Sequence, residues 1–217
     1  MTISNNLSSS NDIYFSGSRP EVAAMVPRGS TIVLDVGCGF GGLAPLLRMR
    51  DVKKIYGIEV NPTASEHLEG AYDRHWIGSV ESINLPQELS SFDCIIFADV
   101  LEHLIDPWKT LKKYVEHLSP GGVIVASIPN ARNLGLIYRL LFQGRWTYSE
   151  SGILDKTHLR FFTRKEIEAL FIQAGLKIEM IDVNRDNYSL LRRLLTGIPR
   201  FFIPDLEVCQ FLIRARK

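Results

Sequence analysis

Residues 33–42 have the sequence Val33-Leu34-Asp35-Val36-Gly37-Cys38-Gly39-Phe40-Gly41-Gly42, and they set the architecture of this 217-residue chain. A short apolar run, typical of a strand buried on both faces, leads into a glycine-rich turn. Glycines let the backbone turn tightly and let a ligand approach main-chain N–H groups at the start of the next helix. The stretch therefore predicts a nucleotide-cofactor loop, with the carboxylate of Asp35 just before it.

The same turn fits two cofactor classes. Gly37, Gly39 and Gly42 satisfy the G-x-G-x-x-G dinucleotide pattern, and Glu59 follows about twenty residues later, where a ribose-binding acid is expected. Asp35 separates the two classes, because a carboxylate repels a pyrophosphate and attracts an ammonium group. S-adenosylmethionine carries an ammonium group and no phosphate, so Asp35 favours it over a dinucleotide.

Several motifs make the chain resemble the class I S-adenosylmethionine-dependent methyltransferases: residues 34–39, 56–59, 92–96 and 99–104. Residues 127–133 and 151–163 narrow the resemblance to bacterial methyltransferases found with glycosyltransferases of surface-polysaccharide assembly. The resemblance covers about residues 14–183. It implies an α/β, Rossmann-like fold with a mostly parallel seven-stranded sheet, helices on both faces, and S-adenosylmethionine as the cofactor.

Composition favours a single methyltransferase domain over residues 1–217. The apolar content of 46% is enough for one substantial core, and the chain is short for two domains. Three widely separated cysteines suggest neither a disulfide framework nor a metal site, and they fit a reducing cytosol. No apolar run approaches a membrane span, and the first thirty residues do not resemble a signal peptide. We therefore expect a cytoplasmic protein that binds no metal.

Apolar runs rich in Val and Ile predict strands, and helical patterns lie between them. A helix begins after the N-cap Asp106, and another begins at Thr163, with Glu166 completing a capping box, and ends at Gly175. This alternation predicts a parallel sheet whose ligands gather at the carboxyl ends of the strands. The strands are expected at residues 31–36, 54–60, 92–98, 123–128 and 176–183. The resemblance implies a last, antiparallel strand near residues 208–214.

Two segments are longer than the connections that the sheet needs between its strands, and we interpret them as acceptor-pocket or lid insertions. They are residues 133–162 and residues 184–205. The second interleaves leucine and phenylalanine with arginine, as an interfacial helix touching membrane lipid would. A lid or a homodimer contact is favoured over that peripheral membrane contact.

The cofactor side of the site is predicted from strand ends and from the resemblance. Asp35 would lie near the methionine amino group, and Glu59 would accept both ribose hydroxyls. Ser79 stands where the family often has an acid that binds the adenine amino group. Arg19 has two alternatives, a pair with the cofactor carboxylate or a surface salt bridge. The predicted cofactor-binding residues are Arg19, Asp35, Gly37, Cys38, Gly39, Glu59, Val60, Ser79, Val80 and Asp99.

The acceptor side is predicted from the segment that distinguishes the narrower family. His158 is assigned as the general base for a hydroxyl acceptor, with Asp155 orienting its imidazole. Residues 130–165 hold seven Lys or Arg against two acids, which suits an acceptor that carries phosphate. A nucleotide-linked or lipid-pyrophosphate-linked sugar fits both the charge and the resemblance. The predicted acceptor-binding residues are His103, Asn130, Arg145 and Arg160.

The sequence thus predicts methyl transfer to an oxygen or nitrogen of a small-molecule or glycan acceptor. An NAD(P)-dependent oxidoreductase is an alternative, although the chain has no Tyr-x-x-x-Lys pair. An RNA methyltransferase could use the basic segment, but that region has few evident base-stacking aromatics, so nucleic acid is not favoured. A non-enzymatic protein that only binds the cofactor is a third class.

Overall fold

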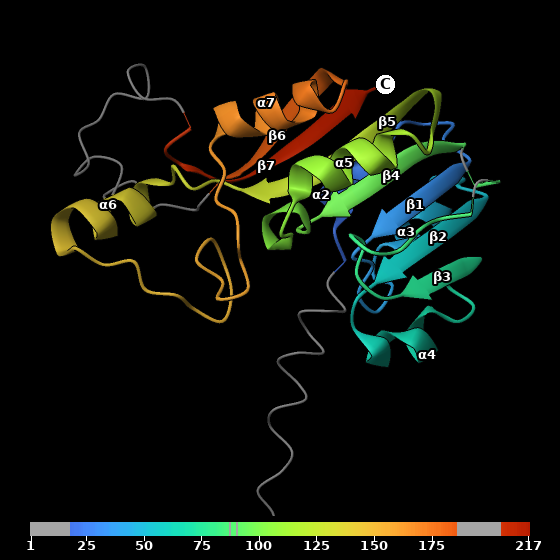
Figure 1. The fold of residues 1–217 in the computed structure, drawn as a ribbon, viewed down its shortest axis with the longest axis horizontal. Coiled ribbons are helices and arrows are strands. Elements are labelled where there is room, and N and C mark those ends of the chain that lie inside the picture. The colour runs from blue at the N-terminus through green and yellow to red at the C-terminus, as the bar shows by residue number, and fades with distance from the viewer. Residues whose placement is uncertain (1–17, 87, 90, 186–204) are drawn as a thin grey trace, which may run out of the picture.

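A seven-stranded sheet in the order β3-β2-β1-β4-β5-β7-β6 forms the centre of the computed structural model (Figure 1). The structure describes residues 18–86, 88–89, 91–185 and 205–217. The strands are β1 (Ile32–Val36), β2 (Lys54–Glu59), β3 (Arg74–Ile77), β4 (Phe92–Ala98), β5 (Leu118–Pro129), β6 (Lys177–Arg185) and β7 (Val208–Arg216).

The pairing of the strands confirms the predicted topology. Strands β3, β2, β1, β4 and β5 are parallel, and β7 runs antiparallel between β5 and β6. Within β1, Asp35 pairs with Gly57 on one side and with Ile96 on the other. The central strand is therefore enclosed by neighbours, which explains its nearly continuous apolar run.

Helices cover both faces of the sheet, as Figure 1 shows. Leu34 and Val36 pack in one hydrophobic cluster with side chains of α5 and α7. Val33 packs on the opposite face with side chains of α2, α3 and α4. The elements are α2 (Pro20–Met25), α3 (Ala44–Arg48), η1 (Pro62–Ala64), α4 (Ser65–Leu68), η2 (Leu101–His103), α5 (Pro107–Val115), α6 (Leu134–Gln143) and α7 (Arg164–Gln173).

The helix boundaries follow the local signals in the sequence. Asp106 caps α5 by accepting a hydrogen bond from the main-chain N–H of Lys109 at 2.9 Å, as expected. Helix α7 begins directly after Thr163, and Gly175 beyond its end has a φ of +86°. The hydroxyl of Thr163 bonds to the side chain of Glu166 rather than to a main-chain N–H, so the predicted capping box is replaced by a side-chain contact.

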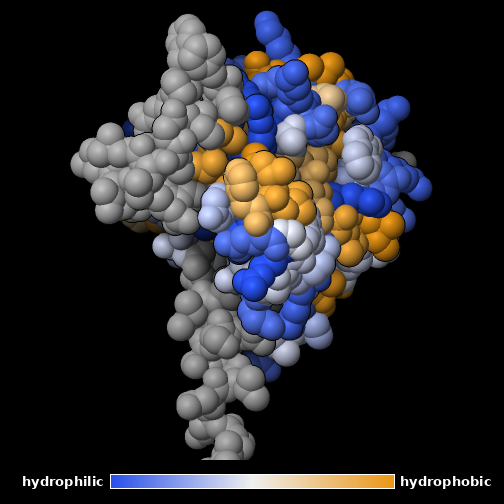
Figure 2. Space-filling model, turned by 90° about the vertical axis from the view of Figure 1, so that its left-hand side faces the viewer, coloured by the Kyte–Doolittle hydropathy of each residue, from blue (hydrophilic) through white to orange (hydrophobic). Residues whose placement is uncertain are grey.

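The first addition to the sheet, residues 133–162, contains α6 and a long loop that extend away from the sheet (Figure 1). Helix α6 exposes Tyr138, Leu141 and Phe142, and Figure 2, which faces this side, shows hydrophobic surface among hydrophilic surface. Most of the second addition, residues 186–204, lies outside the described residues. Among the helices that the structure describes, none combines the length and hydrophobicity that crossing a membrane requires.

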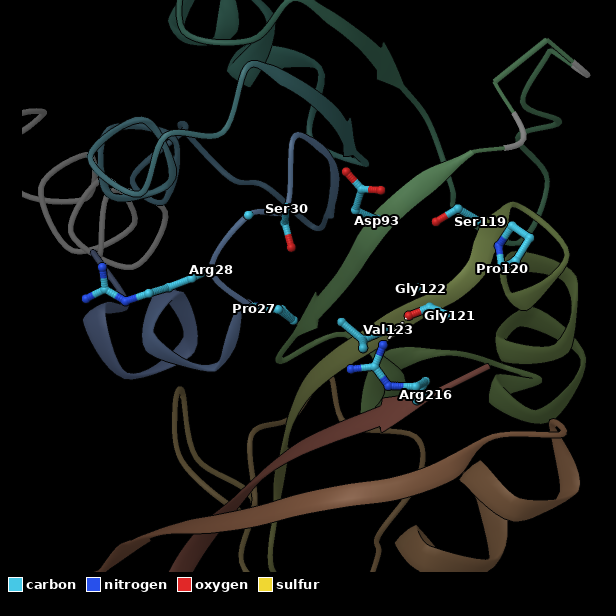
Figure 3. Close-up of a pocket in the computed structure, with 11 residues that line it drawn as sticks. Pro27, Arg28, Ser30, Asp93, Ser119, Pro120, Gly121, Gly122, Val123 and Arg216 are labelled. Carbon is cyan, nitrogen blue, oxygen red and sulfur yellow. Dashed lines mark hydrogen bonds between the residues drawn. The ribbon is translucent and has the colours of Figure 1, made fainter.

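A hollow lies at the amino ends of β1, β4 and β5 (Figure 3). Two of its charged side chains, those of Asp93 and Arg216, have partners within the protein. The Asp93 carboxylate accepts hydrogen bonds from the main-chain N–H groups of Thr31 and Ile32, at 2.7 and 3.0 Å. The Arg216 guanidinium pairs with Glu179. The predicted cofactor residues lie at the other edge of the sheet, where the strands have their carboxyl ends.

Candidate active site

The glycine turn after β1 is fixed by close contacts on two sides. Gly37 and Gly39 have φ values of +70° and +54°, which residues other than glycine rarely adopt. The N–H groups of Gly37 and Cys38 donate to the carbonyl of Ile58 at 2.8 and 3.1 Å. A Cβ atom at Gly37 would lie 2.5 Å from Cγ2 of Val100. The turn therefore packs against both β2 and the loop that follows β4.

Asp35 is a buried carboxyl group in β1, two residues before this turn. It is 2% exposed, and its Oδ2 accepts a hydrogen bond from the Tyr72 hydroxyl at 2.6 Å. Burial raises the pKa of Asp35 to about 7, the Tyr72 hydrogen bond acts against that rise, and the charge of Glu59 adds to it. Near neutral pH the carboxyl is therefore only partly ionised, and a neighbouring cation would favour its charged form.

Glu59 ends β2 and is held by main-chain donors from both sides. Its Oε2 accepts from the N–H of Gly39, and its Oε1 accepts from the N–H of Asn61, both at 2.8 Å. The residue is 3% exposed, whereas the adjacent Val60 is 66% exposed. Each carboxylate oxygen can accept a further hydrogen bond, so the fixed carboxylate still suits a pair of hydroxyl groups.

The segment after β3 is joined to the loop before α5. The Val80 carbonyl accepts from the Tyr114 hydroxyl at 3.2 Å, and the Ser79 hydroxyl accepts from the N–H of Glu81 at 3.3 Å. The Glu81 carboxylate in turn accepts from the N–H of Asp106 at 2.8 Å. Glu81 therefore has a structural contact, and Ser79 and Val80 remain the predicted adenine-side residues.

Arg19 and Asp99 form an ion pair at the carboxyl end of β4. Asp99 has a left-handed φ of +56°. The Arg19 guanidinium also donates to the Ser127 hydroxyl at 3.3 Å and to the Gln210 side-chain oxygen at 3.0 Å, which links β4, β5 and β7. The ion pair also includes Glu21, 2.6 Å from Arg19. The contact of Arg19 with the cofactor carboxylate stays a prediction.

Glu102, His103 and His158 come together beside this ion pair, and we call them the histidine cluster. The two imidazole centroids are 4.6 Å apart, with the rings at 72°. Oε1 of Glu102 lies 4.0 Å from Nε2 of His158. Burial raises the pKa of Glu102, which is 1% exposed, to about 8, and burial lowers the pKa of His103. The cluster thus joins two segments more than fifty residues apart in the sequence.

The predicted orientation of His158 by Asp155 is wrong. The Asp155 carboxylate accepts from the N–H and the hydroxyl of Thr157, at 2.8 and 2.6 Å. Burial acts to raise the pKa of Asp155, but these two hydrogen bonds, together with the charges of His158 and His103, lower it. The imidazole of His158 is oriented instead by the carbonyl of Ile153, 3.0 Å from its Nδ1. Spacing along the chain could not distinguish a side-chain partner from a main-chain one.

The prediction that Asn130 positions the acceptor is also wrong. Asn130 is fully buried, and its side-chain amide donates to the carbonyls of Asp205 and Val208 at 2.8 and 2.9 Å. Its side-chain oxygen accepts from the N–H of Arg132 at 2.9 Å. These contacts tie the end of β5 to the start of β7, so Asn130 has a structural role.

The structure neutralises part of the basic segment. Lys156 pairs with Glu150 at 2.6 Å. The guanidinium of Arg160 donates to the carbonyl of Ile105 and lies 5.8 Å from the ring centre of Trp108, so Arg160 is held at the loop before α5. Arg145 is exposed, as the prediction of an acceptor contact requires.

Sequence analysis missed Tyr72 and Glu102. Glu102 lies inside the motif of residues 99–104, where it follows the apolar pair Val100 and Leu101. Tyr72 had no comparable signal, because only the folded chain brings it to Asp35. With these two included, the carboxyl ends of β1, β2 and β4 carry buried acids, a glycine turn and two histidines.

Residues of this kind and in this order are found in a known protein family. A family model described as a methyltransferase domain matches residues 15–181. The chain belongs to this methyltransferase family. Family membership implies S-adenosylmethionine as the cofactor. The residues fit it, because a buried carboxyl at Asp35 suits an ammonium group and the fixed carboxylate of Glu59 suits two ribose hydroxyls.

Curated relatives agree with this assignment. A probable S-adenosylmethionine-dependent methyltransferase of Mycolicibacterium smegmatis is 30% identical over 68% of this chain and 52% of its own length. The chain spans about half the length of this relative and of the mycobacterial relatives that follow it. A ubiquinone biosynthesis O-methyltransferase of Shewanella is 23% identical over 85% of this chain and 76% of its own length.

A crystal structure of a SAM-dependent methyltransferase from Archaeoglobus fulgidus shares the fold. It covers 98% of this chain and 100% of its own, with a TM-score of 0.66 and 17% identity. The Rossmann-like methyltransferase fold that the sequence predicted is confirmed.

Proposed function

We propose that this chain transfers a methyl group from S-adenosylmethionine to an oxygen or nitrogen of a small-molecule or glycan acceptor. One observation carries the proposal: the glycine turn, the buried acids Asp35 and Glu59, and the histidine cluster lie along one edge of the sheet. Val100 joins the two halves of this edge, because it packs against Gly37 and lies two residues before Glu102. The predicted cofactor residues and the predicted acceptor residues would thereby be held in a fixed relation.

The cofactor half would bind its ligand by charge and by hydrogen bonding. Asp35 would ionise beside the ammonium group, and Glu59 would accept from the ribose hydroxyls. The exposed side chain of Val60 would offer apolar surface next to Glu59. When bound, S-adenosylmethionine supplies an activated methyl group on a positively charged sulfur, and holding the acceptor in line with it supplies most of the rate advantage.

The half of the edge that holds the histidine cluster favours oxygen over nitrogen as the atom that accepts the methyl group. Several relatives carry the name O-methyltransferase. A hydroxyl acceptor loses its proton as the methyl group arrives, and the imidazoles of His103 and His158 are basic groups at this edge. Arg145 and Arg132 are exposed on the segment between them and suit phosphate. We therefore propose a phosphate-bearing sugar intermediate of surface-polysaccharide biosynthesis as the acceptor.

Transfer of tritium from methyl-labelled S-adenosylmethionine tests the activity. We expect the full chain to label a phosphate-bearing glycan fraction of a bacterial extract. Glu59→Gln should abolish labelling, because the amide cannot accept from Gly39, Asn61 and the ribose together, whereas the exposed Glu116→Gln serves as the control. Label that appears only in RNA would contradict the acceptor class, and no label in any fraction would contradict the activity.

A further inference from the structure

We propose that Glu102, His103 and His158 form a binding site for one divalent metal ion of the zinc type. One ligand atom from each residue lies within 4.8 Å of the other two. Two imidazole nitrogens and one carboxylate oxygen form a donor set that suits transition metals better than magnesium or calcium. No sequence motif announced this site, because the ligands come from two distant segments.

The hydrogen bonds of the two histidines fix their tautomers. Nδ1 of His158 lies 3.0 Å from the carbonyl of Ile153, and Nδ1 of His103 lies 3.2 Å from the carbonyl of Thr157. A carbonyl only accepts, so each Nδ1 carries a proton, and in the neutral imidazole each Nε2 keeps its lone pair. Metal-ligating histidines usually show this pattern, with the remaining N–H donated to a carbonyl or carboxylate.

The carboxylate of Glu102 supplies the second, independent observation. The residue is 1% exposed, and neither of its oxygens has a hydrogen-bond partner from another described residue. A buried carboxyl group whose oxygens have no hydrogen-bond partner is unfavourable in either protonation state. Its ion-pair contact among the described residues is with His158, whose Nε2 is 4.0 Å away and bears no proton in the tautomer above. Three Lewis bases therefore face one another, and a cation would satisfy all three.

Small movements would bring the ligands to bonding distance. Zinc binds nitrogen and oxygen at about 2.0–2.2 Å, so paired ligand atoms in a tetrahedral site are roughly 3.5 Å apart. The observed separation of 4.0 Å between Glu102 and His158 needs a shift of about half an ångström. The other two pairs of ligand atoms lie within 4.8 Å of each other and need shifts of up to about 1.3 Å.

Asp155 acquires a role in this site as a positioning residue. Its Oδ1 accepts from the Thr157 hydroxyl at 2.6 Å, and the oxygen of that hydroxyl lies 3.0 Å from Nδ1 of His103. The chain from carboxylate to hydroxyl to imidazole holds the His103 ring in place. Asp155 therefore supports a histidine as predicted, but that histidine is His103 and the support passes through Thr157.

A metal ion here would change the chemistry assigned to His158. An open coordination position would take an oxygen of the acceptor, and coordination makes a hydroxyl more acidic. His158 would then act as a metal ligand instead of a general base. This last step rests on the proposed function, whereas the metal site itself does not.

Calorimetric titration of the metal-free full chain with ZnCl₂, without cofactor or acceptor, tests the site. We expect one Zn²⁺ per chain with micromolar or tighter affinity, little heat from MgCl₂, and a visible Co²⁺ spectrum of nitrogen and oxygen ligation. Glu102→Gln and His158→Gln should each weaken zinc binding at least tenfold. His117→Gln is the matched control, because its Nδ1 also faces a carbonyl, that of Leu89 at 3.3 Å, outside the cluster.

Circular dichroism melting accompanies each variant. Glu102→Gln keeps the volume of the side chain and removes the carboxylate ligand, so it tests the site even if His158→Gln fails to fold. Equal zinc affinity in the wild-type chain and Glu102→Gln would overturn the proposal, as would an intense thiolate band in the Co²⁺ spectrum. Absence of zinc binding with methyl transfer intact would overturn the metal site and leave the proposed function standing.

Discussion

The burial of Asp35 predicts that affinity for S-adenosylmethionine depends on pH. In the free protein the pKa of Asp35 is raised to about 7, and an ammonium group beside the carboxylate would lower it again. Binding therefore requires the loss of a proton wherever Asp35 is still protonated. Affinity should rise as the pH rises through 7 and level off above it.

The magnitude follows from the protonated fraction. With a free-state pKa of about 7, Kd should be about tenfold larger at pH 6 than at pH 8, if the bound state holds Asp35 ionised at both values. The same shift makes ionised Asp35 costly in the free protein. The ordinary pKa of an aspartate is 3.8, so the loss in the free energy of unfolding grows from pH 4 to pH 7. Above pH 7 this loss is about 4 kcal/mol.

Calorimetry at pH 6, 7 and 8 in buffers of different ionisation heat measures both the affinity and the protons released. Asp35→Asn should bind weakly with a flat pH profile, and its free protein should melt at a higher temperature than wild type at pH 8. A wild-type Kd that does not change between pH 6 and pH 8 would refute this reasoning. An Asp35→Asn variant that keeps both the affinity and the slope would refute it as well.

Three further predictions concern folding, the turn and the acceptor. Asn130→Ala should lower the free energy of unfolding by about 2–4 kcal/mol in urea denaturation, because it leaves buried carbonyls unpaired; an unchanged midpoint would contradict this. Gly37→Ala should weaken cofactor binding in calorimetry, because the added Cβ would collide with Val100. Gly29 has a φ of +89° and no atom near the position of a Cβ, so Gly29→Ala should cost about 1 kcal/mol of stability and leave the affinity unchanged. Equal losses of affinity in the two variants would contradict the role of the Val100 contact. Arg145→Ala should raise the acceptor KM severalfold in steady-state assays, and Lys156→Ala, whose charge is paired with Glu150, should not; the reverse order would contradict the acceptor assignment.

The sheet could be predicted because its signals are local. Each buried strand is an apolar run bounded by turn residues, and the glycine turn follows β1 directly in the sequence. The positions of Asp35 and Glu59 at strand ends followed from the same runs. The strand predicted at residues 123–128 starts too late, because β5 begins at Leu118 and includes a proline and two glycines that usually mark a turn.

Side-chain partners could not be predicted in the same way. Asp155 and His158 are three residues apart, yet each binds a different group, because the loop turns Asp155 toward Thr157. Asn130 looked like a strand-end polar residue available to a ligand, but β7 brings two carbonyls to it from the far end of the chain. Glu102 and His158 meet only because residues 151–163 fold back over the end of β4. Such contacts depend on tertiary packing, which spacing along the chain does not encode.

The choice between a sulfonium cofactor and a dinucleotide is the step on which the whole assignment depends. Competitive calorimetry on the wild-type chain at pH 8, with S-adenosylmethionine and with NADH, tests it directly. We expect S-adenosylmethionine to saturate one site and NADH to give no binding heat. Saturable binding of NADH, with no response to S-adenosylmethionine, would contradict the account.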